Sequence, residues 1–218
     1  MKRFIATLAV AALLGVVQTA VAATGPAIDW DPAYTWEPLA TPTNSVAGQQ
    51  LRLVGTVSGF DFPFGDLNPS DPSREYTFVA YGLISQGTTV IGPPAFQIYT
   101  TNYTGGTFEL YEDLSPDAVF APNPPNAQVP STFTDGTLLL SGQFTSFQTV
   151  SNNFTSFNVG NIEGNINWTG GTLVNRLTGP NGSACPGLFT GGSTWYPAVM
   201  IPGYVFRHDG KIDLAVSS

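Results

Sequence analysis

The chain has 218 residues, a formal net charge of −8 and only 10% charged residues. A chain of this length suits one β domain that can bury a full core. Its acidic balance repels phosphate groups, so neither nucleic acid nor anionic lipid is expected as a partner. Because Cys185 is the only cysteine, it cannot form an internal disulfide, and the fold is not a disulfide scaffold.

Residues 1–23 have the features of a secretory signal peptide. Lys2-Arg3 precedes an apolar run over residues 4–17, and the small-residue cleavage site Ala20-Val21-Ala22 follows. The apolar run is shorter than the ~20 residues of a membrane-spanning helix, so we expect no membrane span after cleavage. Cleavage leaves five basic residues against fifteen acidic ones. We therefore expect an acidic bacterial protein, either periplasmic or extracellular.

Residues 24–48 contain four prolines among aromatic and acidic residues. Proline removes backbone donors, so a central strand is not expected here. We interpret this stretch as an extended N-terminal arm, followed by a single β domain over residues 49–218.

The first strands of that domain follow from side-chain alternation. Residues 49–59 form an expected strand, and a Pro-rich acidic loop covers residues 60–74. Residues 75–84 carry apolar side chains on both faces, which predicts a central strand packed on both sides. Gln86-Gly87 predicts a turn toward residues 88–91.

Three later segments are predicted as hairpin turns between strands. They are Asn102–Gly106, Ser151–Asn153 and His208–Gly210, and they join the pairs 96–101 and 107–113, 138–150 and 154–168, and 203–207 and 211–216. The last of them contains Asp-Gly, which favours a type I′ turn.

Helix signals are almost absent, with one short helical turn expected over residues 172–177. Strands joined mostly by tight turns favour an all-β antiparallel meander. About eight such strands can form a closed or partly closed β-barrel, which removes free sheet edges. A two-sheet β-sandwich is the alternative. An outer-membrane barrel would need ten-residue strands with an apolar outward face, and the Pro-rich loops argue against it.

No catalytic residue emerges from the sequence. His208 is the only histidine, so zinc sites built on several histidines or cysteines are excluded. The chain also lacks the Gly-x-Ser-x-Gly sequence that presents a serine nucleophile. We expect His208 to be a turn residue.

The acidic loop offers a candidate calcium site. Asp66 and Asn68 alternate there, with Asp61 and Asp71 nearby, and calcium prefers such oxygen ligands. No glycine or glutamate stands where a calcium loop of the EF-hand type requires it. A loop that is simply solvated is the alternative, and no other cofactor is indicated.

Aromatic residues offer a candidate carbohydrate site. Trp30, Tyr34 and Trp36 lie beside acidic residues in the arm, and Trp195 and Tyr196 form a second pair. Exposed aromatic rings with a few polar groups can bind a sugar. The favoured alternative is that these rings clamp the arm onto the barrel, because each buries a large area.

The segment 161–168 alternates strictly, with Ile162, Ile166 and Trp168 on one face. Its other face carries Asn161, Glu163, Asn165 and Asn167, which could line a lumen or face solvent. Glu163 could also pair with Glu109 or Glu112 as in a glycosidase, provided that the separation fits.

Three stretches, 75–83, 132–144 and 167–173, resemble uncharacterised exported β-rich proteins of Gram-negative bacteria, some of which end in a PEP-CTERM sorting tail. This chain lacks such a tail. The resemblance implies export and β structure, and it brings no activity or site residues.

Three functions follow as hypotheses. The first is an exported non-enzymatic surface, matrix or assembly protein that acts by self-association. The second is a secreted β-barrel that binds a small ligand or carbohydrate. The third is a carboxylate-based hydrolase, which the sequence supports least.

Overall fold

A computed structural model describes residues 27–120, 130–154, 157–178, 185–195 and 201–214. The predicted signal peptide lies outside these residues. Nine strands and two short 3₁₀ helices are present in the described parts. The strands are β1 (Ile28–Trp36), β2 (Gln50–Phe60), β3 (Glu75–Ile91), β4 (Ile98–Thr104), β5 (Thr107–Asp113), β6 (Thr137–Phe154), β7 (Phe157–Gly170), β8 (Gly187–Trp195) and β9 (Phe206–Leu214). The helices are η1 (Ser131–Phe133) and η2 (Val174–Leu177), the latter within the helical turn expected at 172–177.

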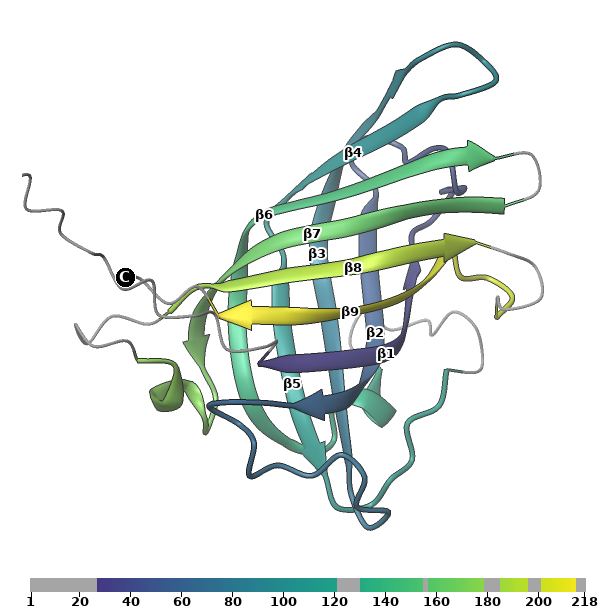
Figure 1. Ribbon diagram of the computed structural model, residues 1–218. Helices are drawn as coiled ribbons and strands as arrows, with labels where there is room; N and C mark the ends of the chain where they lie inside the picture. Colours follow the sequence, from purple (N-terminus) through teal and green to yellow (C-terminus); the bar gives the residue numbers. More distant parts are fainter. Residues whose placement is uncertain (1–26, 121–129, 155–156, 179–184, 196–200, 215–218) are drawn as a thin grey trace, which may run out of the picture.

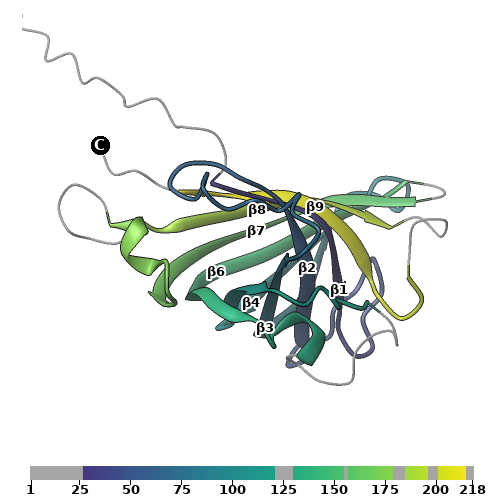
Figure 2. The same ribbon diagram turned by 90° about the horizontal axis from the view of Figure 1, so that it is seen from below.

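The strands form a closed antiparallel barrel (Figures 1 and 2). Strands that follow one another along the chain pair, except β4 and β5, and β1 pairs with β9 to close the sheet. Figure 2 shows β8 and β9 on the opposite side of the barrel from β3 and β4. The predicted all-β barrel is confirmed, and the alternative two-sheet sandwich is wrong.

Strands β4 and β5 share one position in the barrel. Both pair with β3 on one side and with β6 on the other, so the chain continues in one direction through both. The predicted hairpin at 102–106 is therefore wrong. Gly105 and Gly106 have φ values of 68° and 106°, which interrupt the strand without reversing it.

Strand β1 replaces the predicted N-terminal arm. It pairs with both β2 and β9, so it is a central strand of the barrel. Pro32 lies where the register of both pairings shifts, between Trp30 and Ala33. The missing N–H of proline is tolerated at such an irregularity, which is why the prolines did not exclude a strand here.

Strand β9 runs straight through the predicted type I′ turn at His208–Gly210. Residues on both sides of this segment pair continuously with β8. His208 and Ile212 are both buried, so alternation places them on the inner face with Gly210 between them. A Cβ atom at Gly210 would lie 2.5 Å from Cζ2 of Trp30, so this glycine serves close packing rather than a turn.

Two other turn predictions have different outcomes. Strand β3 continues past Gln86-Gly87 to Ile91, with only a register shift between Ser85 and Thr88, so that predicted turn is wrong. The predicted pairing of β6 with β7 is confirmed. Its register extends to Phe154 opposite Phe157, so residues 151–153 lie within β6 and the turn predicted there is wrong.

Aromatic side chains fill the barrel interior. Phe108 contacts Phe78, Phe144, Trp168 and Phe189, with ring centroids between 5.6 and 6.4 Å apart. The buried cluster also includes aliphatic residues from β1, β2, β3, β5, β6, β7 and β9. A core packed in this way leaves side chains, rather than a lumen, at the centre of the molecule.

A second apolar cluster lies on the outside of β1, β2 and β3. Val54 and Val79 are level with Tyr34 across these strands, and they alternate with the inward-facing residues. Phe133 and Tyr204, from segments outside the barrel, cover this face. The prediction that residues 75–84 are packed on both sides is confirmed.

The outer face of β7 is polar. Ile162, Ile166 and Trp168 are buried inside, whereas Asn161, Glu163, Asn165 and Asn167 are exposed. The interpretation of this ladder as a solvent face is confirmed. No helix in the described residues is long and apolar enough to cross a membrane.

Candidate functional site

A shallow groove of about 660 Å³ lies on the outer wall of the barrel. Its side chains come from β1, β7, β8 and β9, and Asp29, Lys211, Thr190 and Glu163 form one row across these strands. Small residues, Ser58 and Gly192, also line it. Alternation sends the polar side chains of these strands outward while the adjacent residues pack the core.

The groove carries an excess of negative charge. Arg207 pairs with Asp31, and Nζ of Lys211 lies 2.9 Å from Oδ2 of Asp213. Asp29, Glu163 and Asp209 have no ion-pair partner among the described residues. Burial raises the pKa of Asp29, and the negative charge of Asp61 raises it further. The arrangement can accept hydrogen bonds from a polyhydroxyl or cationic ligand.

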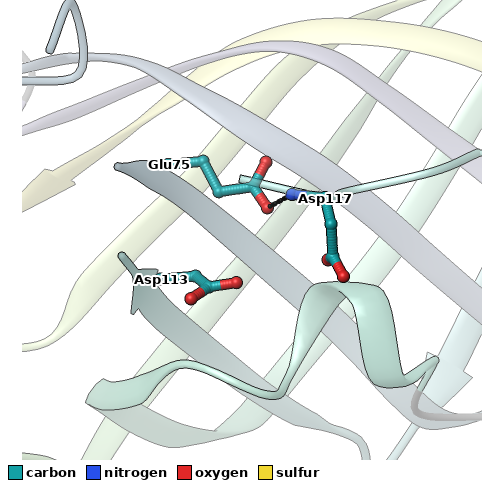
Figure 3. Close-up of side chains that lie close together, drawn as sticks. All are labelled: Glu75, Asp113 and Asp117. Atoms are coloured by element: carbon teal, nitrogen blue, oxygen red, sulfur yellow. Dashed lines mark hydrogen bonds between the residues drawn. The ribbon is translucent and has the colours of Figure 1, made fainter. Parts of the chain in front are cut away.

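Figure 3 shows three carboxylates that gather at one end of the barrel: Glu75, Asp113 and Asp117. One oxygen of each lies within 4.8 Å of the others. Glu75 accepts hydrogen bonds from the backbone N–H groups of Asp117 (2.7 Å) and Ala118 (2.9 Å). Burial raises the pKa of Glu75, and Asp113 and Asp117 contribute to that rise. In the described parts of the chain, no other set of three acidic, histidine or cysteine side chains comes this close.

The predicted calcium ligands have partners within the protein. Asp66 forms an ion pair with Arg176, and Oδ1 of Asn68 accepts the N–H of Ser70 at 3.1 Å. Asp71 accepts hydrogen bonds from Ser73 and Arg74. Asp61 is exposed at the start of the same loop. These contacts hold the loop through Arg74 at its end and Arg176 of η2, and calcium binding by it stays a prediction.

The predicted carbohydrate-binding aromatics are mostly buried. Trp30 is 1% exposed in the core, and Tyr34 and Trp36 belong to the outer apolar cluster. These three rings present no face on which a sugar can stack, and they pack the two sides of a barrel strand rather than clamping a separate arm. Trp195 is half-buried at the end of β8, and Tyr196 lies outside the described residues.

The possible glycosidase pairs are excluded by their positions. Glu112 lies level with Tyr76 on the inner side of the wall, whereas Glu163 points outward. Glu109 is level with Ser141, and Ser141 is level with Gly170. Glu163 is therefore seven residues from that level, or ~23 Å along the strand at about 3.3 Å per residue. Glycosidase carboxyls lie about 5–9.5 Å apart.

His208 is a buried core residue rather than the predicted turn residue. Its Nε2 lies 3.0 Å from Oγ1 of Thr35, and its Nδ1 lies 2.9 Å from Oγ of Ser193. Burial lowers the pKa of His208 to about 3, with a contribution from Arg207. No carboxylate contacts this ring among the described residues, so a neutral histidine braces two hydroxyls inside the barrel.

A polar cavity of about 30 Å³ lies inside the barrel near His208, and Thr35, which contacts His208, is among its lining residues. Glu37, the residue after β1, lines it together with hydroxyl groups from β3, β4 and β6. Ser45 Oγ donates to Oε1 of Glu37 at 2.6 Å, and the Tyr103 hydroxyl donates to Oε2 at 3.1 Å. Burial raises the pKa of Glu37, although these two hydrogen bonds oppose the rise.

No family model, curated protein or solved structure matches this chain. The assignment of function therefore depends on the geometry described above.

Proposed function

We propose that this protein is an exported, non-enzymatic surface, matrix or assembly component that acts through the outside of its barrel. The observation that carries the proposal is the filled interior. The cavity inside the barrel has about 30 Å³, whereas pockets for small molecules have about 300–1,000 Å³. A barrel packed in this way is a scaffold rather than a container.

An exposed apolar tip favours assembly as the role of the scaffold. The connection between β3 and β4 reaches beyond the neighbouring strands at the top of Figure 1. Ile91 and Phe96 are 64% and 69% exposed there, and Ile98 lies beside them. Apolar side chains that gather on an exposed surface are typical of interaction sites. We infer that the tip contacts a second copy of the chain.

Light scattering after size-exclusion chromatography tests this proposal. We expect larger species as the protein concentration rises, and we expect Phe96→Ser to restore the monomer. Leu114→Ser is the matched control, because Leu114 is similarly exposed (70%) but lies after β5, away from the tip. A monomer at every concentration, or an equal effect of both substitutions, would contradict the assembly role.

Binding of a small ligand or carbohydrate is a second candidate function, favoured by the outer groove. Glu163 and Asn161 project from the same strand face of the groove. The carboxylate can accept hydrogen bonds from sugar hydroxyls, and the amide can both accept and donate them. Titration calorimetry against a panel of neutral oligosaccharides tests this function. We expect Asp209→Ala to abolish any binding and Glu109→Gln, outside the groove, to preserve it. Flat titrations across the panel would eliminate this candidate.

A further inference from the structure

Glu37 is a buried acid without a basic partner. Glu37 directly follows β1, and its side chain points into the end of the barrel with that of Thr35, whereas Trp36 between them faces outward. The residue is only 6% exposed. No lysine, arginine or histidine among the described residues forms an ion pair with it.

The surroundings of Glu37 consist of oxygen atoms. Its own partners are the hydroxyls of Ser45 and Tyr103, and Ser45 Oγ lies 2.5 Å from Oγ of Ser85. Thr88 and Thr101 bring a further pair of hydroxyls, 2.8 Å apart, to the same cavity. Two β strands, β3 and β4, and the segment after β1 thus bring neutral oxygens to the surroundings of one carboxyl group.

The cavity beside these oxygens has room for a particle the size of a water molecule. Its volume is about 30 Å³, and a single water needs about 10–15 Å³ measured in this way. A larger organic ligand does not fit without displacing the segment 38–48, several residues of which line the cavity. The size of the space therefore restricts the occupant to water or a small ion.

We propose that this cavity binds one monovalent metal cation, with Na⁺ as the probe, through the Glu37 carboxylate and the surrounding hydroxyl oxygens. An ionised carboxylate is costly to bury unless a positive charge balances it, and hydroxyl donors offset only part of that cost. Hard cations prefer oxygen ligands. One carboxylate balances one positive charge, and no set of three acidic groups forms here within the described residues, as a divalent ion would favour.

Thermal unfolding at constant ionic strength tests the proposal. Choline chloride is replaced stepwise by sodium chloride up to about 200 mM, so that only the small cation changes. We expect the Tm of the wild-type protein to rise by at least about 3 °C, because a ligand bound only by the folded state stabilises it by mass action. Broadening of the sodium NMR signal by the protein provides a direct measure of binding.

Glu37→Gln removes the charge while retaining an acceptor for Ser45 and Tyr103. We expect this variant to lose both the Tm response and the line broadening. Glu109→Gln, which removes an acid of β5 that lies outside both this cavity and the outer groove, is the matched control and should retain both. If Glu37→Gln does not fold, Tyr103→Phe replaces it and should weaken the response at least threefold, because one oxygen near the ion is lost.

Two results would overturn the proposal. One is a wild-type Tm that is the same in sodium and choline chloride, together with a sodium signal that the protein does not broaden, which would leave water as the occupant. The other is a sodium response that persists unchanged in Glu37→Gln, or in Tyr103→Phe where that variant is used, which would place the ion elsewhere on this acidic protein.

Discussion

The indole ring of Trp30 stacks on the phenyl ring of Phe189 inside the barrel, with centroids 5.0 Å apart and 15° between the ring planes. Two glycines make room for this pair. A Cβ atom at Gly191 would lie 2.8 Å from Cζ2 of Trp30, and one at Gly210 would lie 2.5 Å from the same atom. The Trp30 ring, the largest side chain of the core, thus requires glycine at position 191 of β8 and at position 210 of β9.

The first prediction concerns Gly191→Ala. Because the added methyl group would enter the space of the Trp30 ring, we expect the free energy of unfolding to fall by about 1–3 kcal/mol, as for other overpacked cores. Urea denaturation followed by tryptophan fluorescence measures the change. Gly192→Ala is the control, since its Cβ would point outward, with Oδ1 of Asp209 nearest at 3.3 Å. Equal losses in the two variants would show that Trp30 does not set this requirement.

Alternation of side chains predicted most of the wall. Ile162, Ile166 and Trp168 are inside as expected, and the polar residues between them are outside. Turn signals were less reliable, because a glycine can be required either by a turn conformation or by close packing of a neighbouring side chain. The Asp209-Gly210 pair favours a type I′ turn locally, but the space that Trp30 occupies demands a glycine at the same position. Tertiary packing decided between the two.

The candidate sites could not be predicted from the sequence, because the residues that form them are far apart along the chain. Glu37 and Tyr103 are 66 residues apart, and their hydrogen bond exists only because the barrel closes. Glu75 and Asp117 are 42 residues apart. Neither pair has a local motif. Knowledge of the strand register would have placed Glu75 level with Asp113, and the alternation of β1 would then have indicated that Glu37 faces inward.

The second prediction concerns the junction of β4 and β5. A Cβ at Gly106 would lie 2.5 Å from Cδ2 of Leu83, and its φ of 106° is disfavoured for other residues. We expect Gly106→Ala to lower the free energy of unfolding by about 2–4 kcal/mol from these two effects. Gly105→Ala, with a φ of 68° and its nearest neighbour at 3.4 Å, should cost about 1–2 kcal/mol. Chemical denaturation ranks the two, and the reverse order would contradict the packing argument.

The third prediction concerns the outer apolar cluster. Phe133 is fully buried on the outside of the barrel, and its backbone carbonyl accepts a hydrogen bond from Oγ1 of Thr77 at 2.9 Å. We expect Phe133→Ala to lower the free energy of unfolding by about 3–5 kcal/mol, as for other buried phenylalanines. Leu114→Ala, at an exposed position, should change it by less than about 0.5 kcal/mol. A neutral Phe133→Ala would mean that this cluster does not contribute to stability.

The fourth prediction concerns the pH dependence of stability. The pKa of His208 is lowered from 6.5 to about 3 by burial. The unfolded chain therefore binds a proton at a pH where the folded chain does not, and unfolding takes up a proton between these values. The stability that depends on neutral His208 is complete above pH 6.5 and is lost as the pH falls toward 3. The loss per pH unit reaches at most about 1.4 kcal/mol.

Glu37 has the opposite effect on the pH dependence of stability. Burial raises its pKa above 4.5. Its contribution to the free energy of unfolding is therefore lost as the pH rises through the folded-state pKa. A variant that changes only His208 separates the two effects. We expect His208→Gln to be less stable than the wild type at neutral pH, since one hydrogen bond to Thr35 or Ser193 is lost. Its free energy of unfolding should nevertheless decline less steeply between about pH 6.5 and 5. Urea denaturation across this range measures both slopes, and parallel slopes would show that His208 is not the group that protonates on unfolding.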